Sequence, residues 1–143
     1  MRGAVILVVV LVCVSTASAA SSTFYLDLKA GQCAKLLTAK RYRVLSCSSA
    51  THQYEVYAVV HGGWGRAGTP RRAVALARAQ RRCNAVFVKR FGGPIRVGYG
   101  WEAFWPDPGA EARKYADKII CSLIRFPGHP PMGAGTHFRQ AVL

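Results

Sequence analysis

The chain has 143 residues, which is enough for one domain and a targeting segment but too short for two ordinary domains. Hydrophobic residues make up 51% of it, which excludes intrinsic disorder, since a disordered chain needs low hydrophobicity. Lys and Arg number 20 against 6 Asp and Glu, so the formal net charge is +14. The few carboxylates leave little material for chemistry that needs several acidic metal ligands.

The first 19 residues have the pattern of a secretory signal peptide. A positive start with Arg2 precedes an uncharged apolar run over 4–14, and Ala17-Ser18-Ala19 fits the small-x-small pattern that signal peptidase requires. The alternative is an uncleaved membrane anchor, but this run is too short to cross about 30 Å of hydrocarbon. We therefore expect residues 1–19 to be removed. The mature chain is then secreted or held at the cell envelope, with no transmembrane segment.

Four cysteines remain in the mature chain, and an even number in a small exported domain indicates two disulfides. They are Cys33, Cys47, Cys83 and Cys121. A zinc site is the competing use, but no two of them have the separation of about two to four residues that is typical of zinc ligands. Three pairings are possible. We favour Cys33–Cys47 with Cys83–Cys121, and the other two stay open.

The first half of the mature chain predicts strands. Residues 23–29 have the composition of a strand, and residues 33–37 and 42–47 flank a short basic stretch. A hairpin centred near Lys40 would set Cys33 opposite Cys47, within the range that a disulfide spans. Residues 54–60, rich in β-branched and aromatic residues, predict a further strand that ends before a glycine-rich loop over 62–68.

Residues 69–90 predict one long helix. Thr69 is its expected N-cap, Pro70 its first helical residue, and the Gly-Gly-Pro segment 92–94 its end. An apolar face is expected at Ala73, Leu76, Cys83, Phe87 and Phe91. A positive stripe on the opposite face is expected at Arg71, Arg78, Arg82 and Lys89. Because Cys83 lies on the apolar face, it would point toward the core, as a structural disulfide requires.

The last third of the chain completes the predicted domain. Residues 94–109 are rich in Gly, Pro and aromatic residues and predict an irregular, partly buried loop. Residues 111–118 predict a short helix, and residues 119–126 a buried strand that brings Cys121 under the long helix. The expected fold class is α+β, a small antiparallel sheet covered by one long amphipathic helix, over residues 20–126. Residues 127–143 are expected to form a flexible Pro/Gly-rich tail.

The short motifs around the cysteines follow one another in a characteristic order. They are Gly31-Gln32-Cys33, Leu45-Ser46-Cys47-Ser48, His52-Gln53-Tyr54-Glu55-Val56, Pro70, Cys83 and Asp117-Lys118-Ile119-Ile120-Cys121. Over about residues 30–123 this order resembles the septum-formation domain family of exported actinobacterial proteins and lipoproteins. The resemblance implies a secreted, envelope-associated domain related to cell division. It implies no reaction, cofactor or catalytic residue.

His52 is the residue around which an active site would be built. A secreted hydrolase would use it as a base with a carboxylate such as Glu55 or Asp107. A nucleophile is missing, because Cys47 is expected to be oxidised. A strand from residue 54 would also point residues 52 and 55 to opposite faces. We therefore expect His52 to fix the turn after Cys47 and Glu55 to pair with an arginine, and a hydrolase is the alternative.

No metal or cofactor site is expected. The remaining histidines have no compact ligand spacing with one another or with His52. They are His61, His129 and His137.

Positive charge is the strongest functional signal. No acidic residue lies between Glu55 and Glu102. That interval holds Arg66, Arg71, Arg72, Arg78, Arg81, Arg82, Lys89, Arg90 and Arg96. A surface of this kind attracts polyanions, and arginine suits phosphate through bidentate contacts. The alternative is that the charge only keeps a basic protein in solution.

The expected function is therefore that of a non-enzymatic envelope domain. Its anionic contact surface is expected at Arg71, Arg78, Arg82 and Lys89. The partner is expected to be an anionic cell-wall polymer, lipid headgroups or an envelope protein of the division machinery. The signal peptide argues against intracellular nucleic acid. The aromatic residues within 99–105 fit either a stacking surface for sugars or simple core packing.

Overall fold

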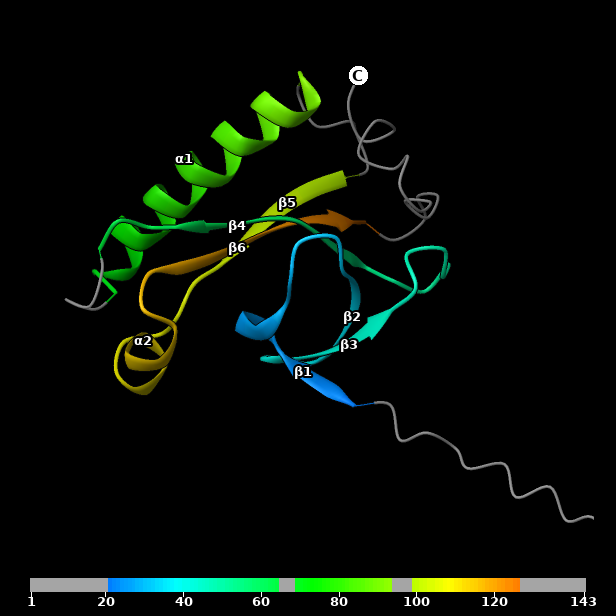
Figure 1. Ribbon diagram of the computed structural model, residues 1–143, viewed down its shortest axis with the longest axis horizontal. Coiled ribbons are helices and arrows are strands. Elements are labelled where there is room, and N and C mark those ends of the chain that lie inside the picture. Colours follow the sequence, from blue (N-terminus) through cyan, green and yellow to red (C-terminus); the bar gives the residue numbers. More distant parts are fainter. Residues whose placement is uncertain (1–20, 65–68, 94–98, 127–143) are drawn as a thin grey trace, which may run out of the picture.

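The computed structural model of the chain describes residues 21–64, 69–93 and 99–126 (Figure 1). The predicted signal peptide and the predicted tail lie outside these residues. The elements, in chain order, are β1 (Ser22–Phe24), the 3-10 helix η1 (Tyr25–Asp27), β2 (Cys33–Thr38), β3 (Arg41–Leu45), β4 (Tyr54–His61), α1 (Arg72–Phe91), β5 (Tyr99–Phe104), α2 (Ala110–Tyr115) and β6 (Lys118–Arg125). Neither α-helix of the described part is long and apolar enough to span a bilayer.

The six strands form one antiparallel sheet in the order β1-β3-β2-β4-β6-β5. The last strand in sequence, β6, lies between β4 and β5. It pairs with β4 from Tyr54↔Ile124 to His61↔Lys118. A strand with neighbours on both sides and apolar layers on both faces needs a nearly continuous apolar sequence, which explains the Ile-Ile-Cys-Ser-Leu-Ile run of β6. The α+β class with an antiparallel sheet is confirmed.

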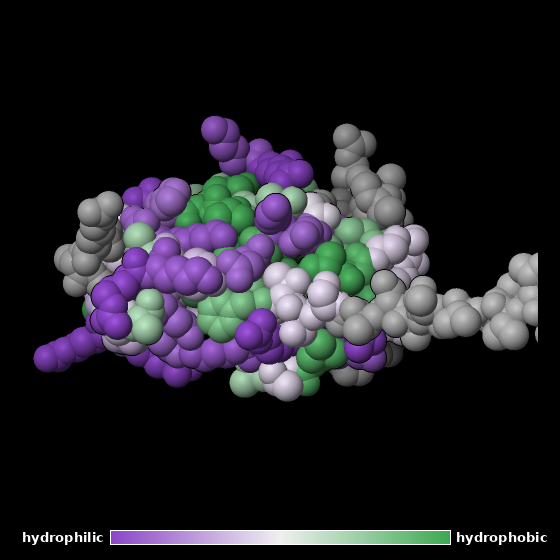
Figure 2. All heavy atoms as spheres, turned by 60° about the horizontal axis from the view of Figure 1, so that its bottom comes forward, coloured by the Kyte–Doolittle hydropathy of each residue, from purple (hydrophilic) through white to green (hydrophobic). Residues whose placement is uncertain are grey.

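Two hydrophobic clusters lie on opposite faces of this sheet. Successive residues of β6 divide between them, because side chains alternate along a strand: Ile119, Cys121 and Leu123 belong to one cluster and Ile120 to the other. The first cluster joins β4 and β6 to α1, which lies alongside this part of the sheet in Figure 1. The second joins η1, β2, β3 and β4. On the face shown in Figure 2, hydrophilic side chains surround smaller apolar areas.

Helix α1 begins two residues later than the sequence predicts. Its N-cap is Arg71, and Thr69 is not the cap because its hydroxyl donates a hydrogen bond to the Pro106 carbonyl oxygen at 2.7 Å. Thr69 thus fixes the entry to the helix against the segment after β5. The end of the helix is as expected: Gly92 has a φ of 80° and its N–H donates to the Val88 carbonyl oxygen at 2.8 Å.

The buried face of α1 is a strict i, i+4 row, made of Ala75, Ala79, Cys83 and Phe87. The expected face is therefore wrong in its first half, because Ala73 and Leu76 are exposed. The small alanines allow the first turns of the helix to approach the sheet closely, whereas Leu76 would hold them apart. The helix contacts β4 and β5. That one amphipathic helix covers the sheet as a whole stays a prediction.

Both favoured disulfides are present, Cys33–Cys47 and Cys83–Cys121. Their Cα–Cα distances are 5.0 and 5.5 Å. The register expected for the hairpin is wrong by two residues, because Cys33 lies opposite Leu45. A bulge between Leu36 and Thr38 accounts for one residue of this difference, and a turn centred between Ala39 and Lys40 accounts for the other. Cys47 therefore reaches Cys33 from beyond the end of β3.

Part of the segment that was expected to be a loop is a strand. Residues 99–104 form β5, which pairs with β6 along its whole length at one edge of the sheet. Gly100 favoured the loop interpretation, but in the strand it makes room for side chains. A Cβ atom at this position would lie 3.1 Å from the Ile124 Cγ2 and Phe126 Cζ atoms. A larger residue would therefore have to displace the Ile124 and Phe126 side chains, and the glycine allows them to pack closely against the edge strand.

The position of the buried face of α1 can be tested with Phe87→Ala. The Phe87 side chain is 2% exposed within the first cluster, so its removal leaves a cavity. We expect the free energy of unfolding to fall by about 3–5 kcal/mol in urea denaturation. Val88→Ala, next to it and 50% exposed, is the control and should cost less than about 1 kcal/mol. Equal losses for the two variants would contradict this orientation of the helix.

Candidate functional site

Three arginines of α1 converge on a hollow beside the end of β4. We call it the arginine hollow: it has a volume of about 290 Å³ and is lined by Arg78, Arg81 and Arg82 together with Gly62 and Gly63. The spacings i+3 and i+4 place the three side chains on neighbouring positions of one helical surface. A Cβ atom on Gly63 would lie 3.6 Å from the Arg82 Nη2 atom, so the loop backbone comes close to the guanidinium.

Asp117 fixes the glycine loop of the hollow from the side of β6. Its Oδ2 atom accepts a hydrogen bond from the Gly63 N–H at 3.1 Å, and its carbonyl oxygen accepts one from the Gly62 N–H at 2.8 Å. Its Oδ1 atom lies 2.9 Å from the His61 Nδ1 atom. The contact with His61, followed by the Gly63 N–H, lowers the pKa of the Asp117 carboxyl. This carboxylate is engaged by the loop and does not line the hollow.

The guanidinium groups of the arginine hollow have no counter-charge in the described part of the chain. There the ion pairs join Lys40 to Asp107 and Glu111 and His61 to Asp117. Helix α1 itself contains no acidic residue. The hollow is therefore a concentration of uncompensated positive charge bordered by loop backbone, which is a surface suited to an anion.

The structure separates the four residues of the predicted stripe. Arg78 and Arg82 line the arginine hollow, Arg71 lines a different cavity, and Lys89 lines neither of the two. Sequence reasoning missed Arg81 as a partner of Arg78 and Arg82. The signal for it was present, because three arginines at i, i+3 and i+4 on an acid-free helix share one surface.

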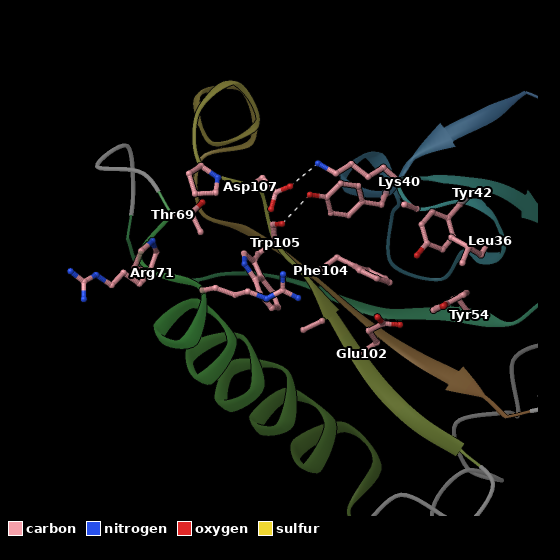
Figure 3. Close-up of a pocket in the computed structure, with 16 residues that line it drawn as sticks. Leu36, Lys40, Tyr42, Tyr54, Thr69, Arg71, Glu102, Phe104, Trp105 and Asp107 are labelled. Atoms are coloured by element: carbon pink, nitrogen blue, oxygen red, sulfur yellow. Dashed lines mark hydrogen bonds and ion pairs between the residues drawn. The ribbon is translucent and has the colours of Figure 1, made fainter.

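The larger cavity, which we call the aromatic cleft, has a volume of about 890 Å³ (Figure 3). Its aromatic lining consists of Tyr25, Tyr42, Tyr54, Phe104 and Trp105. These rings pack mainly on one another: the Tyr42 and Tyr54 centroids are 5.2 Å apart, and Phe104 lies 5.7 Å from Tyr42. Tyr42 and Tyr54 are also buried in the second cluster. The aromatic residues of β5 therefore contribute to core packing at this cleft.

Glu102 is the carboxylate of the aromatic cleft that sequence reasoning missed. Burial raises its pKa, and a hydrogen bond with Tyr54 partly opposes that effect. In Figure 3 its side chain lies beside Tyr54, whereas the Arg71 guanidinium points away from the other lining residues. Arg71 therefore does not form a counter-charge for Glu102.

Asp107 belongs to an ion-pair cluster at the rim of the aromatic cleft. The Lys40 Nζ atom lies 2.7 Å from Asp107 Oδ2 and 2.6 Å from Glu111 Oε1. The Tyr25 hydroxyl donates to Glu111 Oε2 at 2.6 Å. Burial alone would raise the pKa of the Glu111 carboxyl, but the hydrogen bonds from Lys40, Tyr25 and the Asp107 N–H together outweigh it and lower this pKa. The cluster ties α2 to η1 and the β2–β3 turn. The structure thus gives Asp107 a partner other than His52.

His52 and Glu55 lie together, which corrects the expectation that they point to opposite faces. One ligand atom each of Cys33, His52 and Glu55 lies within 4.8 Å of the others. His52 precedes β4, so strand alternation does not apply to it. Its Nδ1 atom is 2.6 Å from the Ser49 carbonyl oxygen, which is the turn contact expected from the sequence. The expected pairing of Glu55 with an arginine stays a prediction.

The His52–Glu55 pair is closed off from solvent. His52 is 0% and Glu55 3% exposed, and neither lines the arginine hollow or the aromatic cleft. Because the Cys33 sulfur is bonded to Cys47, it is not a thiolate that could complete a metal site. His129 and His137 lie outside the described residues.

Comparisons with known proteins gave no match: no family model, no curated protein and no solved structure matches this chain. The resemblance to the septum-formation domain family therefore stays a prediction.

The burial of Glu55 predicts a pH-dependent stability. Burial raises the pKa of its carboxyl from 4.5 to about 7. Between these values the folded chain holds a proton that the unfolded chain releases, so the wild-type free energy of unfolding should fall as pH rises from about 4.5 to about 7, by roughly 3 kcal/mol. Glu55→Gln lacks this titration. In urea denaturation, the free energy of unfolding of the wild type should therefore fall relative to that of Glu55→Gln as pH rises over this range. A difference between the two proteins that does not change with pH would contradict the raised pKa of Glu55.

Proposed function

We propose that this chain is an exported, non-enzymatic domain of the cell envelope that binds a phosphate-bearing polymer through α1, with the arginine hollow holding a phosphate group. The observation that carries this proposal is the convergence of Arg78, Arg81 and Arg82 on one hollow whose lining has no acidic side chain. The planar guanidinium binds phosphate oxygens through two parallel hydrogen bonds. Three such groups around one concave site favour a phosphate over a single carboxylate.

A polymer fits the charge of α1 better than a small anion does. Arg71 and Lys89 lie at opposite ends of the helix, and at 1.5 Å per residue they are about 27 Å apart along its axis. Both are exposed. Repeated phosphates along one chain can therefore contact the hollow and the ends of the helix together, and each additional contact increases the overall affinity.

The location of the domain rests on its covalent framework. Two disulfides are typical of proteins that fold in an oxidising compartment, where the glutathione and thioredoxin systems do not reduce them. With the signal-peptide pattern, this supports a place outside the cytoplasmic membrane. The proposed role in septum formation rests on the motif resemblance alone. A secreted hydrolase built on His52 has less support, because His52 and Glu55 face neither cavity.

The proposal is tested by binding to poly(glycerol phosphate), measured by titration calorimetry at low and high salt. We expect the double charge reversal Arg78→Glu with Arg82→Glu to weaken binding by more than about tenfold. The control is Arg43→Glu with Arg113→Glu, which changes the net charge equally at exposed positions on β3 and α2. The control should lose less than about threefold.

Two further probes distinguish the sources of negative charge. Poly-glutamate of equal length carries carboxylates, and vesicles with phosphatidylglycerol carry lipid phosphates. We expect the phosphate polymer to bind more tightly than poly-glutamate. Equal binding of the two polymers, or equal losses in both double variants, would show that only net charge matters and would overturn the proposed phosphate site. Binding to the vesicles alone would identify lipid headgroups in place of a polymer.

A further inference from the structure

The two disulfides lie in different environments. Cys83 and Cys121 are both 0% exposed and belong to the first hydrophobic cluster. Cys33 is also 0% exposed, but Cys47 is partly exposed in the turn between β3 and β4. An external thiolate can therefore reach the Cys47 sulfur without unfolding of the domain, and it cannot reach either sulfur of Cys83–Cys121.

The buried sulfur of the accessible disulfide faces two titratable side chains. Cys33 and Glu55 are direct partners in the β2–β4 register, so their side chains share one face of the sheet. His52 reaches the same place from the turn before β4. One ligand atom of each lies within 4.8 Å of the Cys33 Sγ atom.

The hydrogen bond of His52 determines which of its ring nitrogens is free. A carbonyl oxygen only accepts hydrogen bonds, so the 2.6 Å contact with Ser49 requires the proton on Nδ1. The Nε2 atom is then an acceptor. It is buried and has no hydrogen-bond partner among the described residues. A buried acceptor without a donor lowers the stability of the fold, and a purely structural role of His52 does not explain why this loss is retained.

Burial also favours the uncharged forms of both groups. It raises the pKa of the Glu55 carboxyl to about 7 and lowers the pKa of His52. The charged group that acts on His52 from the neighbouring strand is Arg125 of β6, and it lowers the pKa of His52 further. Below about pH 7 the proton of this cluster therefore resides on the Glu55 carboxyl, and His52 Nε2 remains a buried acceptor close to it.

We propose that Cys33–Cys47 is an exchange-active disulfide that reacts with thiols outside the domain, and that Glu55 and His52 supply and take back the proton of the Cys33 sulfur. The substrate class is a thiol, either a small molecule or a cysteine pair of another exported protein. Cys83–Cys121 remains the structural cross-link during this reaction.

The reaction balances as two successive thiol–disulfide exchanges. A substrate thiolate attacks Cys47 Sγ, a mixed disulfide forms, the Cys33–Cys47 bond breaks, and Cys33 leaves as a thiolate that takes the Glu55 proton. A second substrate thiolate attacks the substrate sulfur of the mixed disulfide and releases Cys47 as a thiolate. Two substrate thiols are oxidised to one disulfide, and the protein disulfide is reduced to two thiols. Protonation of the departing Cys33 sulfur favours the first step, because a neutral thiol does not attack the mixed disulfide in return.

The test follows the reduction of each disulfide separately in the oxidised full-length mature protein. Dithiothreitol is one reductant and a reduced, unfolded carrier protein with one cysteine pair is the other. Samples are alkylated at intervals and mapped by mass spectrometry, and each rate is divided by the fraction of reductant present as thiolate. Far-UV circular dichroism checks that the domain stays folded. The variants are Glu55→Gln and His52→Gln.

We expect Cys33–Cys47 to be reduced at least about a hundredfold faster than Cys83–Cys121, because only one has an accessible sulfur. In the wild type the normalised rate should fall by about tenfold between about pH 6 and about pH 8, as the Glu55 carboxyl loses its proton. In Glu55→Gln it should be independent of pH. A response to dithiothreitol alone identifies small thiols as the substrate, and a response to both reductants includes proteins.

Equal reduction rates of the two disulfides would overturn the proposal. The same normalised pH profile in Glu55→Gln and the wild type would also overturn it, because access alone would then explain the reaction. If Glu55→Gln does not fold, the wild-type profile and His52→Gln decide the question: a flat wild-type profile, or an unchanged rate in His52→Gln, contradicts the role of the pair.

Discussion

The Cys83–Cys121 disulfide joins α1 to β6. β6 is bordered by β4 and β5, so a cross-link from the helix to β6 holds all three strands and the helix together. The Tyr57 hydroxyl of β4 donates to the Cys83 carbonyl oxygen at 3.1 Å, and the Arg90 Nη1 atom donates to the Tyr57 carbonyl oxygen at 2.6 Å. With the helix held in this way, the positions of its exposed arginines are set relative to the sheet and the Gly62–Gly63 loop.

The charge distribution of α1 follows from how little of the helix is buried. The row of Ala75, Ala79, Cys83 and Phe87 is narrow, so most positions of the helix face solvent and are free to be basic. A helix with this many cations and no acids is stabilised by packing and by its cross-link rather than by ion pairs along its surface. The positive surface therefore has a cost in self-repulsion, and an anionic ligand would relieve it.

Local patterns in the sequence predicted which helices and strands form better than they predicted how these elements pair and contact one another. The structure contains the elements that local patterns indicated: the β2–β3 hairpin, the strand 54–60, the long helix, the late strand and both disulfides. The bulge at Leu36–Thr38, which accounts for one of the two residues by which the hairpin register differs, has no sequence signal as clear as a turn motif. β5 was missed because Gly100 signals a loop locally, whereas its role comes from contact with Ile124 and Phe126. The proximity of His52 to Glu55 depends on the turn at 49–52, which strand alternation could not describe.

The candidate sites, like the strand register, depend on contacts between segments that are distant in the sequence. The positive helix surface could be predicted from composition and spacing, but its division into a hollow and a cleft depends on the Gly62–Gly63 loop and on β5, which are neighbours of the helix only in the fold. Thr69 illustrates this point. Its sequence context is that of an N-cap, yet its hydroxyl donates a hydrogen bond to the carbonyl oxygen of Pro106. Pro106 follows β5, the strand that was not predicted from the sequence.

The most direct test of the account is an NMR spectrum of the arginine side chains during addition of poly(glycerol phosphate). Each Nε–Hε group reports its own contact with an anion. If the arginine hollow holds a phosphate group, the signals of Arg78, Arg81 and Arg82 shift first and saturate together, while Arg43 and Arg113 respond weakly. Shifts that are spread evenly over all arginines would contradict it, because the polymer would then have no preferred site on the domain.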